Sequence, residues 1–402
     1  MLDWLLTPLT YLLPFLFVLT VVVTVHELGH FWTARAFGTA IDRFSIGFGR
    51  AIVRWTDKSG VEWRIGWLPL GGYVSFAGDE TVTSVPDREA LETLKQQVRA
   101  REGVGAERRY FHFKPVWQRA LIVAAGPFAN FVLSVGIFAA LLGVLGEVVA
   151  PPRVAGVEPG SAAERAGFKA GDLIVAAQGR PIDNFLDVRE IVAVRAGSPI
   201  EFVVERDGER LTLVGTPERR VSRDEMGSRE IGVLGLENSP RDHYRRRLGP
   251  LEAVPAGVER TWRVLETSLV YIGRIFTGRE SGDQLSGPLG IAQASGAIAQ
   301  AGADAGEGLR EKALGALIGM VGLTAILSVG IGFLNLLPVP VLDGGHLAFY
   351  AYEAVARRPL GAGVQAASYR VGLALLLGLM LFVTWNDLQR LQVFQFLGRL
   401  FS

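Results

Sequence analysis

The sequence contains no cysteine among its 402 residues. This absence excludes disulfide bonds and thiolate chemistry, so any bound metal must be held by histidine and carboxylate side chains. Histidine is scarce as well, and only five occur: His26, His30, His112, His243 and His346. Two of the five lie four residues apart, and a search for a metal site therefore begins with that pair.

Net charge is nearly absent too. The formal charge is +1, which suggests neither a nucleic acid nor a strongly acidic partner. Residues 4–25 carry no charged side chain, and about 20 apolar residues are enough for a helix to cross a bilayer. Residues 1–5 lack Lys and Arg, and the apolar run leads into the histidines rather than into a cleavage site. An ordinary signal peptide is therefore not expected.

Long apolar runs recur along the chain and predict a polytopic α-helical membrane protein with about four transmembrane helices. The third run is broken by the sequence NLLPVP. The fourth has Arg370 near one end, where a long basic side chain can reach the membrane surface. The four predicted segments are about 8–34, 118–146, 313–342 and 367–386.

Basic residues are unevenly distributed around these segments, and loops rich in Lys and Arg tend to be cytoplasmic. Residues 1–10 have none. We therefore expect the loops after the first and third segments to be cytoplasmic. Both termini and the long 147–312 stretch are expected on the opposite side. The basic residues near the segment ends are Arg35, Arg43, Arg50, Arg54, Arg108, Arg109, Lys114 and Arg119 in the first loop, and Arg357 and Arg358 in the second.

Residues 38–80 contain short runs rich in β-branched and aromatic residues, punctuated by Gly and Pro, which predict β-structure. Their aromatic content favours a sheet near the membrane face or dipping into it. A plain cytoplasmic β-hairpin is the alternative. Residues 81–110 are polar and predict a loose helical insert.

Residues 150–217 have the pattern of a small soluble domain, with short strands, a helix and a hairpin that turns at Asp207-Gly208. No second copy follows. The charged residues 218–245 are typical of a linker. Residues 256–278 mix apolar and basic positions at helical spacing, which suits a helix on the membrane surface or a helix that covers a soluble core.

The motif HELGH at 26–30 directly follows the first apolar run. Four-residue spacing puts His26 and His30 on one face of a helix, where both imidazoles can reach one zinc ion. Glu27 can then accept a proton from a water at the metal and return it to a leaving amine. Packing or capping histidines beside a surface Glu are the alternative. Ionisable groups at the end of a membrane helix favour the metal.

A catalytic zinc usually has a third protein ligand and one open position. Asp343 is a candidate, because it follows a 30-residue uncharged run and a Pro-x-Pro break and precedes Gly344-Gly345. Prolines stop a helix, and glycines allow a close backbone approach. His346 is a rival ligand. A loop-capping aspartate with a surface histidine is the structural alternative.

Two asparagines lie within apolar segments. Asn335 can hold a substrate backbone or an oxyanion, or make a hydrogen bond between helices. Gly126 and Asn130 in the second segment suit close helix packing with an amide bond across the contact. Proximity of this pair to the active site is the alternative.

Taken together, these motifs resemble the site-2 protease group of intramembrane zinc metalloproteases, and specifically the bacterial regulator-of-sigma-E protease type. The similarity covers nearly the whole chain. The motifs occur in the family's order: HELGH at 26–30, FSIGFG at 44–49, PLGGYV at 69–74, AAGPFAN at 124–130, SGPLGIA at 286–292 and NLLPVPVLDGG at 335–345.

The resemblance implies one Zn²⁺ held by His26, His30 and Asp343, with Glu27 as the catalytic base and Asn335 as the substrate-positioning residue. Residues 44–76 are then similar to the membrane-associated β-loop that receives an unwound substrate in extended form. Residues 150–217 are similar to an inserted α+β PDZ domain on the periplasmic side of a bacterial inner membrane. In this family PDZ domains are thought to filter substrates.

The expected organisation follows from the runs and the resemblance together. It comprises a first transmembrane helix with HExxH (1–37), a cytoplasmic or membrane-associated β-loop region (38–115), a second transmembrane helix (116–149), the PDZ domain (150–217), a periplasmic linker and amphipathic helix region (218–312), a third transmembrane helix with the LDG motif (313–345), and a fourth with the C-terminal tail (346–402).

The expected partners are the lipid bilayer and a membrane-spanning protein substrate, either an anti-sigma factor already trimmed by a first protease or another single-span protein. Better-known members of this type carry two tandem PDZ domains, and one is found in this chain. If a size filter needs two such domains, gating in this chain must be simpler or shared with the helix at 256–278.

Two other function classes compete with the protease. A non-proteolytic scaffold that binds C-termini through its PDZ domain predicts no zinc, and the intact HExxH with a distant Asp argues against it. A metal or ion transporter would place His, Glu and Asp along a pathway and is favoured by inverted repeats. No such repeat is visible, since the first and third segments share no pattern.

Overall fold

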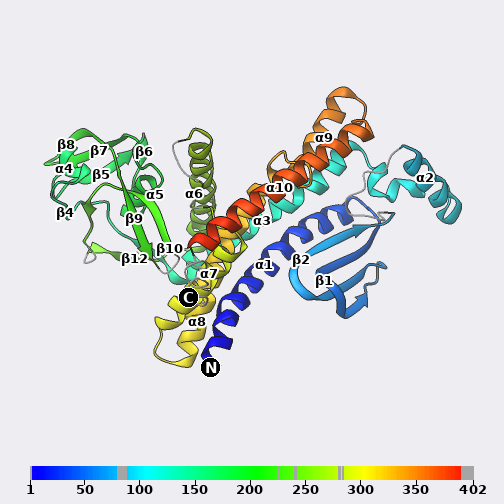
Figure 1. Ribbon diagram of the computed structural model, residues 1–402, viewed down its shortest axis with the longest axis horizontal. Helices are drawn as coiled ribbons and strands as arrows, with labels where there is room; N and C mark the ends of the chain where they lie inside the picture. Colours follow the sequence, from blue (N-terminus) through cyan, green and yellow to red (C-terminus); the bar gives the residue numbers. More distant parts are fainter. Residues whose placement is uncertain are drawn as a thin grey trace, which may run out of the picture. The chain divides into compact units, whose positions relative to one another are not determined.

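A computed structural model describes residues 2–78, 88–224, 227–239, 242–278, 282 and 285–390. The chain forms two compact units. The first unit comprises Met1–Ile137 and Gly287–Trp385, and the second comprises Phe138–Ser286 and Asn386–Ser402 (Figure 1).

Four helices are long and apolar enough to cross a membrane, which agrees with the four predicted segments. In lipid a backbone has no water to bond, so an isolated apolar segment must satisfy its amides as a helix. The four helices are α1 (Leu2–Ala36), α3 (Val116–Leu145), α8 (Leu309–Leu336) and α10 (Ala362–Arg390).

The third apolar run ends earlier than its predicted limit at 342. Helix α8 stops at Leu336, because Pro338 and Pro340 cannot continue a helix. Asp343 then begins a separate helix, α9 (Asp343–Ala356). The short turn between α8 and α9 therefore determines where the candidate carboxylate ligand lies.

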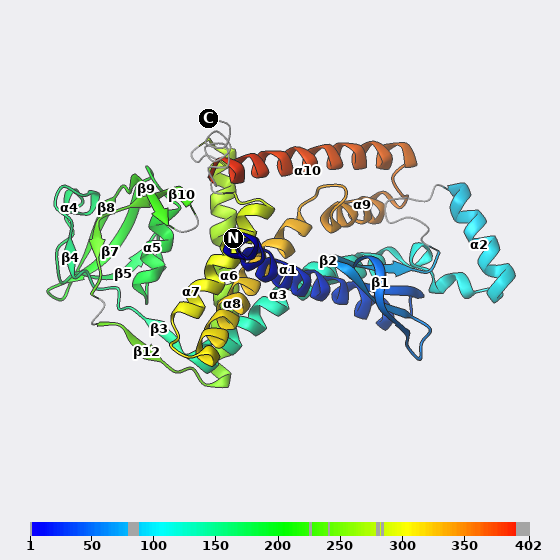
Figure 2. The ribbon, with the colours of Figure 1, turned by 60° about the horizontal axis from the view of Figure 1, so that its bottom comes forward.

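Helix α7 (Pro288–Asp304) packs against both α1 and α8 (Figures 1 and 2). The packing is close because small residues line it. A Cβ on Gly302 would lie 2.3 Å from the carbonyl oxygen of Gly315, and a Cβ on Gly296 would lie 2.1 Å from the ring of Tyr11. The predicted organisation placed this stretch in the 218–312 linker region. In the structure it packs with the helices that can span a membrane, and Gln293, Gln300 and Asp304 interrupt its apolar run in the sequence.

The β-rich stretch forms a long bent hairpin of β1 (Ile41–Thr56) and β2 (Glu62–Phe76) beside α1 (Figures 1 and 2). Phe44 is partnered with both Val74 and Trp63. Residues 43–46 therefore lie between two stretches of β2, and residues 72–76 form one edge of the sheet. Gly47 and Gly49, with φ of 80° and 84°, make the bend in β1.

An aromatic cluster fixes the hairpin to the last third of α1. The ring of Phe31 lies 5.3 Å from Phe44 and 5.1 Å from Trp63, measured between centroids. Nearer the start of α1, the hydroxyl of Thr20 donates a 2.9 Å hydrogen bond to the carbonyl of Pro69. The hairpin follows α1 along a stretch that can span a membrane, so its exposed apolar side chains are suited to contact lipid.

The polar insert contains the helix α2 (Arg88–Glu102), as predicted, and residues 79–87 before it lie outside the described part of the chain. Two short 3-10 helices follow it, η1 (Ala106–Arg109) and η2 (Phe111–Phe113). Helix α9 is then tied to the start of α3, because Arg119 donates a 2.7 Å hydrogen bond to Glu353.

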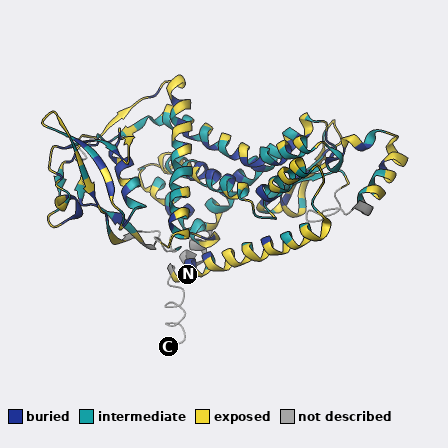
Figure 3. Ribbon diagram, turned by 90° about the horizontal axis from the view of Figure 1, so that it is seen from above, coloured by how far each residue is buried: buried dark blue, intermediate teal, exposed yellow. Residues whose placement is uncertain are grey.

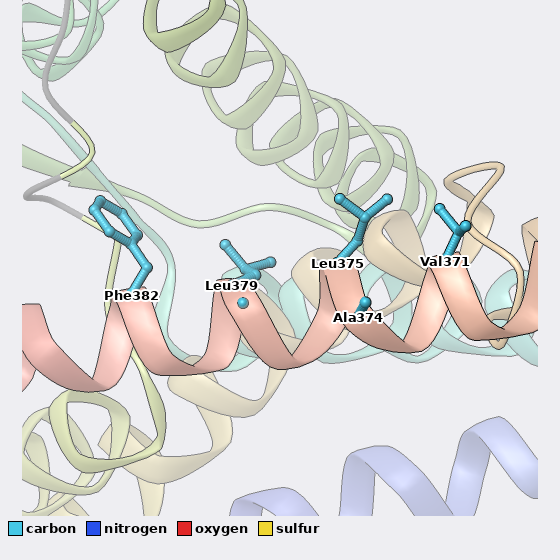
Figure 4. A pocket seen from close by; sticks show the side chains of 6 residues that line it. Val371, Ala374, Leu375, Leu379 and Phe382 are labelled. Carbon is cyan, nitrogen blue, oxygen red and sulfur yellow. The ribbon is translucent and has the colours of Figure 1, made fainter.

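Helix α10 is mostly exposed (Figure 3). It approaches the rest of the first unit closely at Gly372, where a Cβ would lie 1.9 Å from the carbonyl oxygen of Pro340. One face of α10 forms an open apolar trough that suits lipid chains and carries no chemistry (Figure 4). The trough is lined by Val371, Ala374, Leu375, Gly378, Leu379 and Phe382.

The second unit is built on a four-stranded sheet in the order β6-β5-β7-β8. Ile174, Ile200, Phe202 and Val204 are completely buried in its core. The sheet and its helices are β5 (Leu173–Ala177), β6 (Arg180–Pro181), β7 (Ile200–Arg206), β8 (Glu209–Gly215), α4 (Ala162–Arg165) and α5 (Phe185–Ala193).

This domain extends past its predicted end at 217. The stretch expected to be a linker contains a hairpin of β9 (Glu218–Asp224) and β10 (Gly227–Val233), and Leu234 is buried in the domain core. The charges that suggested a linker lie on a two-stranded hairpin, which can be polar on an open face. Two short strand pairs complete the unit: β4 (Gly156–Val157) with β11 (Leu236–Glu237), and β3 (Glu147–Val149) with β12 (Tyr244–Arg246).

Helix α6 (Pro250–Phe276) has two unlike faces. One face meets the domain through ion pairs, of which Arg260 with Glu190 at 3.2 Å is one. Arg263 with Asp187 and Arg180 with Glu266 are two more. Another face leaves an apolar stripe exposed, made of Leu251, Val254, Val258, Trp262 and Leu269. Helix α6 therefore covers the domain, as one of the two sequence alternatives held, and its other face stays apolar and exposed.

Candidate metal centre

Three side chains from distant parts of the sequence converge in the first unit. His26 and His30 come from α1, and Asp343 is the first residue of α9. Their nearest atoms are Nε2 of each imidazole and Oδ2 of the carboxylate. The distances are 3.2 Å between the two Nε2 atoms, and 3.0 Å and 3.5 Å from Oδ2 to His26 and His30. Among the residues that the structure describes, this is the group with ligand atoms close enough to share a metal ion.

The spacing of these atoms fits zinc. Zinc–ligand bonds of about 2.0–2.1 Å in a tetrahedron place ligand atoms about 3.3 Å apart. The Oδ2 atom of Asp343 is buried, yet no N–H meets it with hydrogen-bond geometry among the described residues. A buried carboxylate oxygen normally has a partner. Two imidazole nitrogens and a carboxylate oxygen that face one another at these distances are therefore suited to a shared cation.

Close packing of α1 on α3 positions the two histidines. A Cβ on Gly29 would lie 2.2 Å from the carbonyl oxygen of Ala125. A Cβ on Gly126 would lie 2.3 Å from Nε2 of His30 and 2.9 Å from Cε1 of His26. Glycine at 126 is therefore required by the imidazoles themselves, beyond the helix packing that the sequence suggested.

The outward-facing nitrogens of both imidazoles meet α3. Nδ1 of His30 lies 2.9 Å from the carbonyl oxygen of Ile122, and Nδ1 of His26 lies 3.2 Å from the side-chain amide of Asn130. Asn130 is fully buried. The sequence left open whether Gly126 and Asn130 serve packing or lie near the site, and the structure shows both. The motif AAGPFAN carried this signal, but the contact of Asn130 with His26 was not predicted.

Glu27 lies between the histidines and the hairpin. A Cβ on Gly72 would be 3.5 Å from Cγ of Glu27, and the carboxylate faces the backbone of Val74. Residues 72–76, at the edge of the sheet, therefore lie directly beside the carboxylate of Glu27, the predicted catalytic base.

His346, the rival ligand, is not among the converging side chains. It is beside Tyr369, with 3.2 Å between its Nε2 and the phenol oxygen. Geometry therefore favours Asp343 over His346 as the third ligand. Asn335 lies in the last turn of α8, half-buried, and its amide has no hydrogen-bond partner among the described residues.

Four helices able to span a membrane and an HExxH helix that meets a distant carboxylate define a membrane zinc metalloprotease. The chain belongs to peptidase family M50, whose family model matches residues 14–379.

Named relatives agree with this class. The chain is 49% identical over 395 residues to the metalloprotease MmpA of Caulobacter vibrioides, covering 98% of this chain and 99% of the relative. It is 44% identical over 384 residues to a protein of Agrobacterium fabrum named as a zinc metalloprotease, Atu1380, covering 95% and 96% of the two chains. The regulator of sigma-E protease RseP of Escherichia coli is 29% identical over 478 residues, with 94% and 98% covered.

Proposed function

We propose that this protein is an intramembrane endopeptidase that cleaves the transmembrane segments of single-span proteins in regulated intramembrane proteolysis. His26, His30 and Asp343 hold one zinc ion, and Glu27 is the catalytic base. The observation that carries the proposal is the convergence of three ligand atoms at the end of a helix able to span a membrane, beside an open sheet edge.

Glu27 performs the proton transfers of the reaction. Its carboxylate accepts a proton from the attacking water and returns it to the leaving amine. Zinc, when bound, supplies Lewis acidity towards the scissile carbonyl and towards water. The low water content expected at the end of a membrane helix strengthens the electrostatic interactions of the charged groups.

A substrate helix hides its peptide bonds, because every amide is already bonded within the helix. It must therefore unwind before Glu27 can act. The edge at residues 72–76 pairs with β1 on one side, and on its other side it would offer main-chain hydrogen bonds to an extended segment, as in strand addition. Such a segment would pass the carboxylate that faces Val74. The amide of Asn335, which has no hydrogen-bond partner among the described residues, would hold the same segment from the end of α8.

The proposed setting is the bacterial inner membrane, with the active site near the cytoplasmic face and the 150–217 domain in the periplasm as a PDZ domain. The basic loops beside the first and third apolar segments support this orientation. An anti-sigma factor already trimmed by a first protease is the proposed substrate type. Its support is similarity to the regulator of sigma-E protease of Escherichia coli.

The decisive variant for catalysis is Glu27→Gln. We expect it to abolish cleavage of a purified single-span substrate in detergent or liposomes while the protein keeps one zinc per chain. A metal count and a cleavage assay on the same sample measure both. Retained turnover by Glu27→Gln would overturn the role of Glu27, and wild-type protein that hydrolyses only a soluble unfolded peptide would overturn the intramembrane substrate.

Orientation can be tested because the chain has no cysteine. Arg101→Cys on α2 and Arg210→Cys at the start of β8 each introduce one exposed thiol. In intact spheroplasts we expect a membrane-impermeant maleimide to label Arg210→Cys and to spare Arg101→Cys until the membrane is opened. The reverse pattern would contradict the proposed topology.

A further inference from the structure

Both proposed histidine ligands bind α3 through the nitrogen that does not face the metal centre, and the two contacts differ in one respect. The partner of His30 is the carbonyl oxygen of Ile122, at 2.9 Å. A carbonyl can only accept a hydrogen bond, so the proton of His30 must lie on Nδ1. Its Nε2 then carries a free lone pair towards the centre.

The partner of His26 is the side chain of Asn130, at 3.2 Å from Nδ1. A side-chain amide can donate through nitrogen or accept through oxygen, and a half-turn exchanges the two atoms with almost no change in shape. If Asn130 donated, the proton of His26 would lie on Nε2. That atom lies 3.0 Å from Oδ2 of Asp343 and 3.2 Å from Nε2 of His30, so the proton would occupy the space that a metal ion needs.

If Asn130 accepts instead, both imidazoles have the same tautomer. Each has its proton on Nδ1, directed at α3, and each has a free Nε2 directed at Asp343. Metal-binding histidines commonly donate their second N–H to a carboxylate or carbonyl in this way, which fixes both the tautomer and the ring orientation.

The backbone and Cβ of Asn130 are fixed from the opposite side by α8. The hydroxyl of Ser328 donates a 2.9 Å hydrogen bond to the backbone carbonyl of Asn130. A Cβ on Gly332 would lie 3.1 Å from the Cβ of Asn130. The side chain is therefore held between α1 and α8, completely buried, and cannot turn away from His26 without disturbing two helices.

We propose that Asn130 is a positioning residue for the metal centre: its side-chain oxygen accepts the Nδ1–H of His26 and thereby selects the tautomer whose Nε2 can bind zinc. This inference rests on the proposed ligand set of His26, His30 and Asp343. It adds a residue on α3 whose effect is on metal affinity, exerted through the imidazole without contact with the substrate.

Two substitutions at the position separate accepting from donating. Asn130→Asp has nearly the same shape and retains an acceptor oxygen but loses the donor. Asn130→Leu has a similar volume and retains neither. Ser328→Ala is the matched control, because it removes a hydrogen bond to the same residue and leaves the amide beside His26 intact.

The measurement is metal binding by the full-length protein in detergent, followed without any substrate. Zinc affinity is obtained by competition with a chelator, and the visible absorption of the Co²⁺-substituted protein reports the coordination geometry. We expect Asn130→Leu to weaken zinc binding about 10- to 100-fold and to alter the cobalt spectrum. We expect Asn130→Asp to stay within about threefold of the wild type, and Ser328→Ala to bind zinc like the wild type.

Each result decides something. Equal losses of zinc affinity in Asn130→Asp and Asn130→Leu would show that Asn130 donates its hydrogen bond to His26. Wild-type zinc affinity in Asn130→Leu would show that Asn130 does not position His26. Either result would overturn the inference. If Asn130→Leu fails to fold, the comparison of Asn130→Asp with Ser328→Ala still decides it. Unchanged binding after His26→Ala would instead overturn the proposed ligand set, which distinguishes that failure from a failure of the role of Asn130.

Discussion

Each of the two units contains an aspartate with a buried carboxylate oxygen, and the two aspartates have opposite surroundings. Asp172 in the second unit is fully buried and accepts hydrogen bonds from Nε and Nη2 of Arg206, at 2.6 Å and 2.8 Å, and from the backbone N–H of Lys169 at 2.9 Å. Asp343 in the first unit has a buried Oδ2 that faces two imidazole Nε2 atoms without a hydrogen bond.

The contrast distinguishes a carboxylate that stabilises the fold from one that is suited to bind a cation. A buried charge is normally satisfied by the fold itself, as Asp172 is. Asp343 would be expensive to bury in its present surroundings unless a positive charge joined it. Substitution of the two residues should therefore have separate consequences, one for metal and catalysis and the other for stability.

The largest expected effect is that of Asp343→Asn. An amide is a much poorer zinc ligand than a carboxylate, so we expect loss of bound zinc and a fall in cleavage of more than about 1,000-fold. Thermal unfolding without added metal should hardly change, because no hydrogen bond among the described residues is lost at Oδ2. If the Asp343→Asn protein kept one zinc per chain, Asp343 would not be a metal ligand, and its contrast with the structural Asp172 would be lost.

A second prediction concerns the space for the imidazoles. Gly126→Ala would put a methyl group 2.3 Å from Nε2 of His30, whereas Gly136 on the same helix has nothing within 4 Å of its Cβ position. We expect Gly126→Ala to weaken zinc binding at least about 100-fold through displaced ligands and Gly136→Ala to leave it unchanged. Chelator competition on both purified variants measures this, and equal affinities would show that the glycine serves helix packing alone.

The third expected effect is on stability. Asp172→Asn leaves Arg206 facing a neutral amide, and hydrogen bonds to charged groups contribute about 2 kcal/mol to the free energy of unfolding. We expect faster backbone hydrogen exchange in β5 and β7 of the full-length protein, with zinc content unchanged. Loss of zinc in Asp172→Asn would mean that the two aspartates do not have separate roles.

The smallest effect is the pH dependence of that stabilisation. Burial alone would raise the pKa of Asp172, but the hydrogen bonds from Arg206 and the Lys169 backbone outweigh it and lower the pKa. A carboxyl whose pKa is lower in the folded state stabilises the fold above its unfolded pKa of about 4 and loses this contribution as the pH falls below it. The difference in hydrogen exchange between the wild type and Asp172→Asn should therefore be full at pH 6 and shrink at pH 3. A constant difference would contradict the assignment.

Several features of this protein were predictable from local sequence because their cause is local. Uncharged apolar runs must form helices in lipid, which is why four membrane-spanning segments could be located. The i, i+4 spacing of His26 and His30 places them on one helical face whatever surrounds them. Asp343 was identified as a candidate by its charge after a long apolar run and a proline break.

Other features depend on contacts between segments far apart in the chain, and the spacing of apolar residues along the sequence does not predict such contacts. Helix α7 was not predicted because Gln293, Gln300 and Asp304 interrupt its apolar run, and its place against α1 and α8 comes from close Gly contacts. The domain end at 217 was placed too early because the charges of β9 and β10 concealed a hairpin.

The sequence by itself determined the membrane helices, the histidine pair with its glutamate, and a short set of possible third ligands. Only the tertiary structure decided that Asp343 rather than His346 meets the histidines. It also decided that α3 contacts the Nδ1 atoms of both imidazoles. Ile122 contacts His30 across 92 residues of sequence, and Asn130 contacts His26 across 104. The physical reason is that a residue's type and spacing set what it can bind, whereas packing between distant helices sets what lies within reach.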